Sequence, residues 1–199
     1  SVIIEETDKD VLVEEKSPID TNKEVSMDLN GTNVEKDSIN LNNNCSYSGE
    51  LREGIPHGMG IFNHGQQAFS IFGYFANGYL DLTKPVKFED CCGTTQEFQV
   101  SNIVDKNKKE FNKKLLIPID SLCKVIGSLC SNNSLSLIIS KTSQVQEGIV
   151  FNKNFVYLGM LDFDYGLPAE KGFILKSDGE VQEGSFSRQG WIKDEWLRD

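Results

Sequence analysis

The sequence predicts a mainly β protein, an elongated antiparallel β-meander of stacked hairpins with a short helix in a central insertion and a disordered acidic N-terminal tail. Three observations predict this fold class. From residue 45 onwards, apolar and aromatic residues alternate with polar residues on the two-residue period of a strand. Glycines and other turn-forming residues interrupt these runs at short intervals. A short glycine pattern also recurs, which is typical of arrays whose units pack on their neighbours.

The first 44 residues differ from the rest in composition. They contain 11 acidic residues, 4 lysines and no aromatic residue, so they carry −7 of the chain's net charge of −10. Such a segment buries too little apolar surface to offset the entropy lost when a chain becomes ordered. We therefore expect an acidic, disordered tail over residues 1–44 and a β-repeat domain over residues 45–199.

Turn signals define the first hairpins of the domain. The stretches YSGEL, from Tyr47, and GMGIF, ending at Phe62, predict two strands around a turn in which Gly54 takes a positive φ. The stretch AFSIFGYF predicts a third strand, and the Asn77-Gly78 pair after it is a strong signal for a tight turn.

The segment 83–144 departs from this pattern, and we interpret it as divergent repeats or an inserted subdomain. It contains a predicted helix, because Leu122, Val125, Ile126 and Leu129 have helical spacing after a potential N-cap at Asp120 or Ser121. Strands are expected over 84–90, 97–104 and 134–140, and again over 155–191, where aromatic residues and glycines return.

One pattern, a glycine followed by any residue and then an apolar residue, recurs along the chain. Its copies begin at Gly49, Gly73, Gly159 and Gly184, and the first three have an aromatic or aliphatic residue two positions earlier. Residues i, i+2 and i+4 of a strand share one face. Each glycine therefore leaves a gap on that face, which we expect a ring from the neighbouring hairpin to fill.

The stretch 47–60 resembles the MORN repeat, Y-x-G-x-x-x-x-G-x-x-H-G-x-G. The matching residues are Tyr47, Gly49, Gly54, His57, Gly58 and Gly60. Copies at 71–78, 157–172 and 182–190 match in part, and 83–144 does not match. The resemblance implies a single-layer β-meander that acts as a scaffold, dimerises through terminal repeats and tethers proteins to membranes or to the cytoskeleton.

The expected function is that of a non-enzymatic cytoplasmic scaffold or protein-interaction module. Its apolar strip would bind a protein partner or a second copy of the chain in a homodimer. The expected contact residues are Tyr47, Leu51, Phe75, Tyr157, Leu161, Phe186, Trp191 and Trp196. Because the chain is acidic, the composition argues against general binding to nucleic acid.

An alternative function is recruitment to the periphery of an anionic membrane. It would use the one basic cluster of the sequence: Lys106, Lys108, Lys109, Lys113 and Lys114. Each basic residue near such a surface contributes about 1 kcal/mol. The competing interpretation is a solvated charged segment, because Asp105 and Glu110 interrupt the cluster.

A further alternative is an enzyme, or an accessory domain of one, whose chemistry lies in the middle segment. A dyad of His57 with Cys45 or Cys123 would be the candidate nucleophile and base, but we expect His57 to hydrogen-bond a turn instead. The five irregularly spaced cysteines include an adjacent pair and no CxxC, so we expect reduced thiols and neither a metal site nor a cofactor.

The tail contains a small internal repeat, VIIEE at Val2–Glu6 and VLVEE at Val11–Glu15. Three β-favouring residues followed by two acids can add as a strand to the edge of another protein's sheet. The pattern resembles SUMO-interacting motifs, which makes SUMO an alternative partner. The competing interpretations are a solvated tail and a strand that pairs within the chain.

Overall fold

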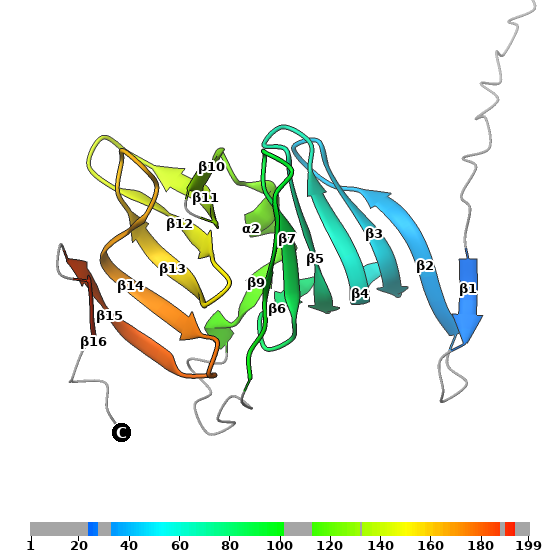
Figure 1. The fold of residues 1–199 in the computed structure, drawn as a ribbon. Helices are drawn as coiled ribbons and strands as arrows, with labels where there is room; N and C mark the ends of the chain where they lie inside the picture. The colour runs from blue at the N-terminus through cyan, green and yellow to red at the C-terminus, as the bar shows by residue number, and fades with distance from the viewer. Residues whose placement is uncertain (1–23, 28–32, 102–112, 132, 188–189, 194–199) are drawn as a thin grey trace, which may run out of the picture.

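The structure is a computed structural model that describes residues 24–27, 33–101, 113–131, 133–187 and 190–193 (Figure 1). These residues form two antiparallel sheets of consecutive hairpins and a short helix, α2 (Ile119–Cys123). The predicted fold class, a mainly β meander of hairpins, is confirmed. No helix of the described part is long and apolar enough to cross a membrane.

The first sheet takes up the N-terminal half of the described chain. Its order is β1-β2-β3-β4-β5-β6-β9, and β7 pairs with both β5 and β8. Its strands are β1 (Glu24–Met27), β2 (Asn33–Asn40), β3 (Cys45–Arg52), β4 (Ile55–His64), β5 (Phe69–Ala76), β6 (Tyr79–Asp81), β7 (Val86–Glu89), β8 (Thr95–Phe98) and β9 (Leu116–Pro118).

The second sheet follows the chain without a crossover, in the order β10 to β16. Its strands are β10 (Gly127–Ser131), β11 (Ser134–Lys141), β12 (Gln146–Phe151), β13 (Phe155–Leu161), β14 (Pro168–Lys176), β15 (Val181–Ser187) and β16 (Gly190–Lys193). Every neighbouring pair is antiparallel.

The predicted turns lie where the sequence placed them. Gly54 has a φ of 75° in the turn between β3 and β4. Asn77 and Gly78 have φ values of 50° and 83° between β5 and β6. Two consecutive positive φ angles are the signature of the type I′ hairpin turn, whose twist matches that of the flanking strands.

One hydrophobic core joins the two sheets. Phe62 and Ile71 of the first sheet belong to the same buried cluster as Leu135 and Leu175 of the second. Because these buried residues come from both sheets, the two sheets cover one another, and a smaller separate cluster contains Tyr157 and Leu161 of the second sheet. The result differs from the single layer that the MORN resemblance implies, and Figure 1 shows α2 between the two sheets.

The tail boundary at residue 44 is wrong. Residues 33–40 form β2, which pairs with β3 in register from Glu35–Leu51 to Asn40–Ser46. The backbone of β3 needs hydrogen-bond partners on its outer side, and these bonds do not depend on apolar content. Residues 1–23, which include both VIIEE and VLVEE, lie outside the described residues.

The predicted helix is shorter than its spacing indicates. It ends at Cys123, and Leu129 lies in the strand β10. The backbone N–H of Ile126 donates to the carbonyl oxygen of Ile138 at 2.8 Å, so the chain pairs with β11 instead of continuing the helix. The residue at the N-cap position is Pro118, not Asp120 or Ser121.

The middle segment 83–144 is divided between the two sheets. Its first part supplies β7 and β8, which extend the first sheet beyond β5. Its last part supplies β10 and β11, which begin the second sheet. The segment is therefore built into the meander and is not an inserted subdomain.

Candidate functional site

Tyr47 of β3 is held rigidly at the centre of the first repeat. Its side chain is fully buried, and its Oη donates a hydrogen bond to the carbonyl oxygen of Glu50 at 2.7 Å. The ring stands edge-on to that of Phe75, with 5.0 Å between the ring centroids. The tyrosine thus closes the irregular end of the β3–β4 ladder, where the register shifts after Gly49.

Tyr157 of β13 repeats this geometry in the second sheet. Its Oη donates to the carbonyl oxygen of Met160 at 2.8 Å, and its ring stands edge-on to Phe186 at 5.5 Å. The register shift of its ladder comes after Gly159, at the equivalent place. The sequence repeat is therefore also a repeat of local structure, with one copy in each sheet.

The repeat glycines pair with one another across strands. Gly60 pairs with Gly49 on one side and Gly73 on the other. The second sheet has a longer ladder, formed by Gly148, Gly159, Gly172 and Gly184. A Cβ atom on Gly60 would collide with the ring of Tyr47. At Gly60 the gap is filled by a ring of the same hairpin, whereas at Gly73, one of the glycines for which a neighbouring ring was expected, a Cβ would meet the aliphatic side chains of Leu80 and Val86.

The expected partner-binding strip faces the interior. Tyr47, Leu51, Phe75, Tyr157 and Leu161 are buried, and Phe186 is half-buried against Tyr157. Side chains without exposed surface cannot contact a partner, so the strip is corrected to a core. Tyr47, Leu51 and Phe75 belong to the cluster that both sheets share, whereas Tyr157 and Leu161 form a separate, smaller cluster against which Phe186 packs. The backbone of Trp191 pairs with Phe186 in β16, and Trp196 lies outside the described residues.

The opposite side of the first sheet carries an exposed set of large apolar residues, here called the outer apolar face. Along β4 buried residues alternate with exposed or half-buried residues. The members of the face and their exposed fractions are Ile55 (47%), Met59 (41%), Ile61 (38%), Phe72 (40%) and Tyr79 (43%). The register pairs Ile61 directly with Phe72, so the face is continuous from β4 to β5.

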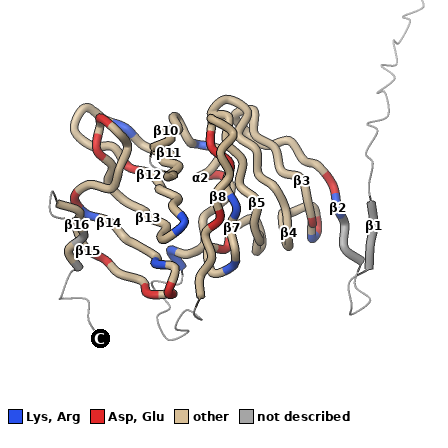
Figure 2. The backbone as a smooth tube through the Cα atoms, in the orientation of Figure 1, with Lys and Arg blue, Asp and Glu red and all other residues tan. Residues whose placement is uncertain are grey.

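Charged residues lie beside the two main strands of the outer apolar face: Oε2 of Glu50 accepts a hydrogen bond from the N–H of Met59 at 2.7 Å, and Lys87 pairs with Phe72. Neither β4 nor β5 contains a Lys, Arg, Asp or Glu, and Figure 2 shows both strands almost entirely in the colour of uncharged residues. Lys87 and Glu89 of β7 border the face, and with Ile61 and Phe72 they line a shallow groove of about 450 Å³. The signal was present in the sequence, because Met59 and Ile61 alternate with the buried residues Gly60 and Phe62 of the same strand.

A second concave site lies between the two sheets. It has a volume of about 590 Å³, which is within the range of small-ligand pockets. The backbone of the glycine ladder of the second sheet forms part of its wall, together with apolar side chains such as Ile117, Ile149 and Phe173. Lys114 forms an ion pair with Glu183 at 2.7 Å at this groove.

Of the five residues of the lysine cluster, the structure describes only Lys113 and Lys114. Lys106, Lys108 and Lys109 lie outside the described residues. Lys114 is paired with Glu183, and its Nζ lies 5.3 Å from the centroid of the Phe173 ring. This lysine therefore contacts the second sheet of its own chain.

The alternative of a dyad between His57 and a cysteine has no support from the contacts of His57. Nδ1 of His57 accepts a hydrogen bond from the backbone N–H of Asn77 at 3.1 Å, which confirms the expected contact with a turn. In the register of β3 and β4, Cys45 lies opposite His64, which is at the other end of β4 from His57. Seven residues of strand, roughly 20 Å, separate His57 from His64.

The thiols of Cys45 and Cys123 are buried beside one another. Burial raises the pKa of Cys45, and it raises the pKa of Cys123 to about 12. His64 is buried as well, and its burial lowers the pKa of the imidazole. Because the thiolate is the reactive form, these two thiols, which keep their protons at neutral pH, are poor nucleophiles.

We expect the free energy of unfolding to fall as the pH rises from about 9 towards about 12. The pKa of Cys123 is about 12 in the folded chain against 9.0 for a free thiol, so the folded state retains the proton longer. This contribution is complete below pH 9 and is lost as the pH rises through the folded-state pKa. Urea midpoints at a series of alkaline pH values measure the decline, and Cys123→Ala should make it shallower. A midpoint that is constant to pH 11 would contradict the expectation.

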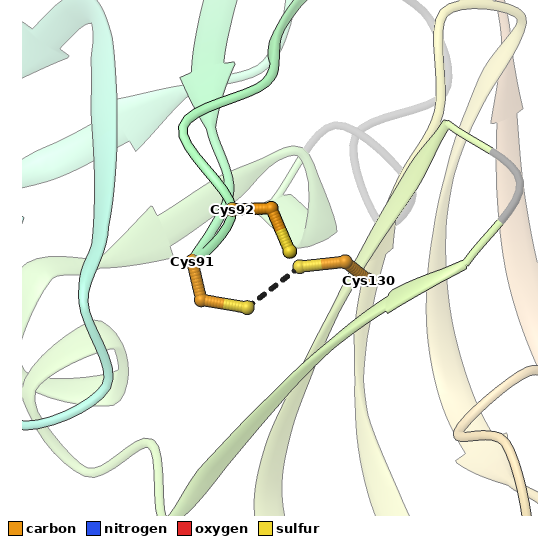
Figure 3. A group of neighbouring side chains, drawn as sticks. All are labelled: Cys91, Cys92 and Cys130. Atoms are coloured by element: carbon orange, nitrogen blue, oxygen red, sulfur yellow. Dashed lines mark hydrogen bonds between the residues drawn. The ribbon is translucent and has the colours of Figure 1, made fainter.

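Three other cysteines converge from the two sheets (Figure 3). Sγ of Cys91 lies 2.7 Å from Sγ of Cys130, and the three sulfur atoms of Cys91, Cys92 and Cys130 lie within 4.8 Å of one another. Cys91 and Cys92 are exposed, and Cys130 of β10 is half-buried. Sequence spacing did not indicate this cluster, because the packing of the two sheets brings it together.

Asp90 shapes the turn that presents the two adjacent cysteines. Its Oδ1 accepts hydrogen bonds from the backbone N–H groups of Cys92 and Thr94, each at 2.9 Å. The N–H of Gly93 donates to the carbonyl oxygen of Asp90 at 3.0 Å, and Gly93 has a φ of 79°. The tip of the β7–β8 hairpin is therefore a defined turn that holds both cysteines opposite β10.

No model of a protein family matches this chain, and no curated protein matches it. The likeness to the MORN repeat therefore rests on the motif itself, of which 47–60 is the complete copy. Function has to be inferred from the outer apolar face, the groove between the sheets and the thiol cluster.

Proposed function

We propose that this chain is a non-enzymatic protein-interaction module that binds a partner protein through the outer apolar face of its first sheet. The observation that supports the proposal is the exposure of five large apolar side chains on one continuous face, each between 38% and 47% exposed. Contiguous apolar surface of this kind is typical of interaction sites. Phenylalanine, tyrosine and methionine are also enriched in protein interfaces.

The mode of binding follows from the topology. β4 is hydrogen-bonded to β3 on one side and to β5 on the other, so a partner cannot add a strand beside it. The contact is made by side chains, with Phe72 and Ile61 as the central pair. A ring and a branched side chain on hydrogen-bonded strands lose little conformational entropy on binding, which favours affinity.

The charge of the chain favours a different protein over a second copy as the partner. Each copy carries a net charge of −10, and two such molecules repel one another. The complementary partner has an apolar patch that can cover Phe72 and Ile61, with polar residues to meet Lys87 and Glu89 at the border of the face. Self-association through the same face is the competing outcome.

Photocrosslinking from a single position tests the proposal. A photoreactive phenylalanine analogue at Phe72 is compared with the same analogue at Phe163, an exposed phenylalanine of the β13–β14 connection. We expect a protein of cell extract to be crosslinked from position 72 and not from position 163. Identical crosslinks from both positions would contradict the proposal.

The affinity of the purified partner provides the second step. Phe72→Glu should weaken binding by about 30-fold or more, because central interface residues contribute about 2 kcal/mol or more. Phe163→Glu should leave the affinity unchanged. Sedimentation of the chain alone distinguishes the competing outcome, since a dimer that Phe72→Glu dissociates would identify a second copy as the partner.

A further inference from the structure

The thiol cluster consists of Cys91, Cys92 and Cys130, and none of these residues belongs to the outer apolar face. Two of its members come from the tip of the β7–β8 hairpin of the first sheet, and the third comes from β10 of the second. We propose that Cys91, Cys92 and Cys130 form a binding site for one thiophilic metal ion, Zn²⁺ or Cu⁺, bound by three thiolates.

The geometry of the sulfur atoms fits such an ion. Zinc binds thiolate sulfur at about 2.3 Å, so two sulfurs on one tetrahedral ion lie about 3.8 Å apart. The sulfurs of Cys91 and Cys130, at 2.7 Å, lie closer together than this, and all three sulfurs lie within 4.8 Å of one another, so binding requires the first pair to move apart. Small rotations of Cys91 and Cys92, which are exposed at the hairpin tip, bring all three sulfurs to equal distances.

The donor set selects the class of metal. Thiolates favour Cu⁺ and Zn²⁺, whereas hard ions such as Mg²⁺ and Ca²⁺ require oxygen ligands. Three protein ligands satisfy three-coordinate Cu⁺ or leave the fourth position of Zn²⁺ to a water molecule. Binding breaks three S–H bonds, forms three metal–sulfur bonds and releases three protons to the buffer, without an oxidant or a reductant.

The position of the site gives it a structural consequence. An ion on these sulfurs would connect the hairpin tip of the first sheet to the edge strand of the second. Because the ion would bind the folded chain and not the unfolded one, it should raise the thermal midpoint with increasing metal concentration. This effect is a readout of binding that does not depend on any activity of the chain.

Anaerobic metal titration of the full chain under a phosphine reductant tests the proposal. We expect one equivalent of Co²⁺, used as a spectroscopic substitute for Zn²⁺, to give sulfur-to-metal charge-transfer absorption. Competition with a chromogenic zinc chelator and with a Cu⁺-specific chelator distinguishes the two ions. Cys91→Ser and Cys130→Ser should each weaken binding by at least about 100-fold, since even partners outside the first coordination shell contribute about 10–100-fold.

The matched control is Cys45→Ala, which removes a buried thiol that is not part of the cluster. It should retain the absorption and the metal-dependent rise in thermal midpoint, whereas Cys91→Ser, at an exposed position, should lose both while remaining folded. Binding that survives Cys91→Ser and Cys130→Ser would overturn the proposal. So would the absence of binding at micromolar metal.

Discussion

Gly60→Ala should lower the free energy of unfolding by about 3 kcal/mol, at the upper end of the usual range for an overpacked core. The added Cβ would collide with the ring of Tyr47. That ring cannot move aside, because its Oη is bound to the carbonyl oxygen of Glu50 and its edge packs on Phe75. Gly60 is not among the residues with a positive φ, so the expected loss is steric and not a matter of backbone strain.

Gly127→Ala is the matched control for this substitution. Gly127 also lies in a strand without a positive φ, but a Cβ there would approach only Cδ1 of Ile138, at 3.3 Å. The end of a flexible side chain can yield, so we expect a loss of less than about 1 kcal/mol. Urea unfolding followed by circular dichroism measures both variants, and equal losses would contradict the steric explanation.

A double-mutant cycle isolates the collision itself. Tyr47→Leu removes the ring that Gly60→Ala would strike, so the two losses should be less than additive by about 1 kcal/mol or more. The equivalent cycle in the second sheet joins Gly172 with Tyr157, since a Cβ on Gly172 would meet that ring. Similar coupling free energies in both sheets would show that the tyrosine ring excludes a side chain at the glycine position in both copies of the repeat.

Local features of the fold could be predicted from the sequence. The turn at Asn77-Gly78 and the turn at Gly54 depend on the φ preferences of the residues themselves, and both are present. The two-residue period of a strand places Tyr47 with Leu51, and Ile71 with Phe75, on one face of their strands. All four side chains are buried.

Long-range features could not be predicted in this way. Alternation shows that a strand has two faces, but whether the face of Tyr47 or that of Ile61 is covered depends on where the second sheet packs. Residues Ile126 and Leu129 have helical spacing, yet pairing of the chain with β11 overrides it. The contact of Cys91 with Cys130, 39 residues apart, depends entirely on the packing of the two sheets.

Phe151→Ala should lower the free energy of unfolding by about 3–5 kcal/mol, the usual cost of removing a fully buried aromatic ring. Phe151 of β12 has no exposed surface, and its ring centroid lies 5.6 Å from that of Phe88 in the first sheet. The substitution therefore opens a cavity at the contact between the sheets. Phe163→Ala, at an exposed position, should cost less than about 1 kcal/mol by the same urea unfolding measurement.

The same variant tests whether the two sheets fold as one unit. Because both sheets contribute to one buried cluster, a cavity at Phe151 should increase native-state hydrogen exchange in β3–β5 as much as in β11–β14. Phe88→Ala, from the other side of the contact, should give the same pattern, and the two substitutions should show a coupling of about 0.5–1.5 kcal/mol. Faster exchange confined to the second sheet would instead mean that the sheets unfold independently, and the shared core would then contribute little to the cooperativity of the fold.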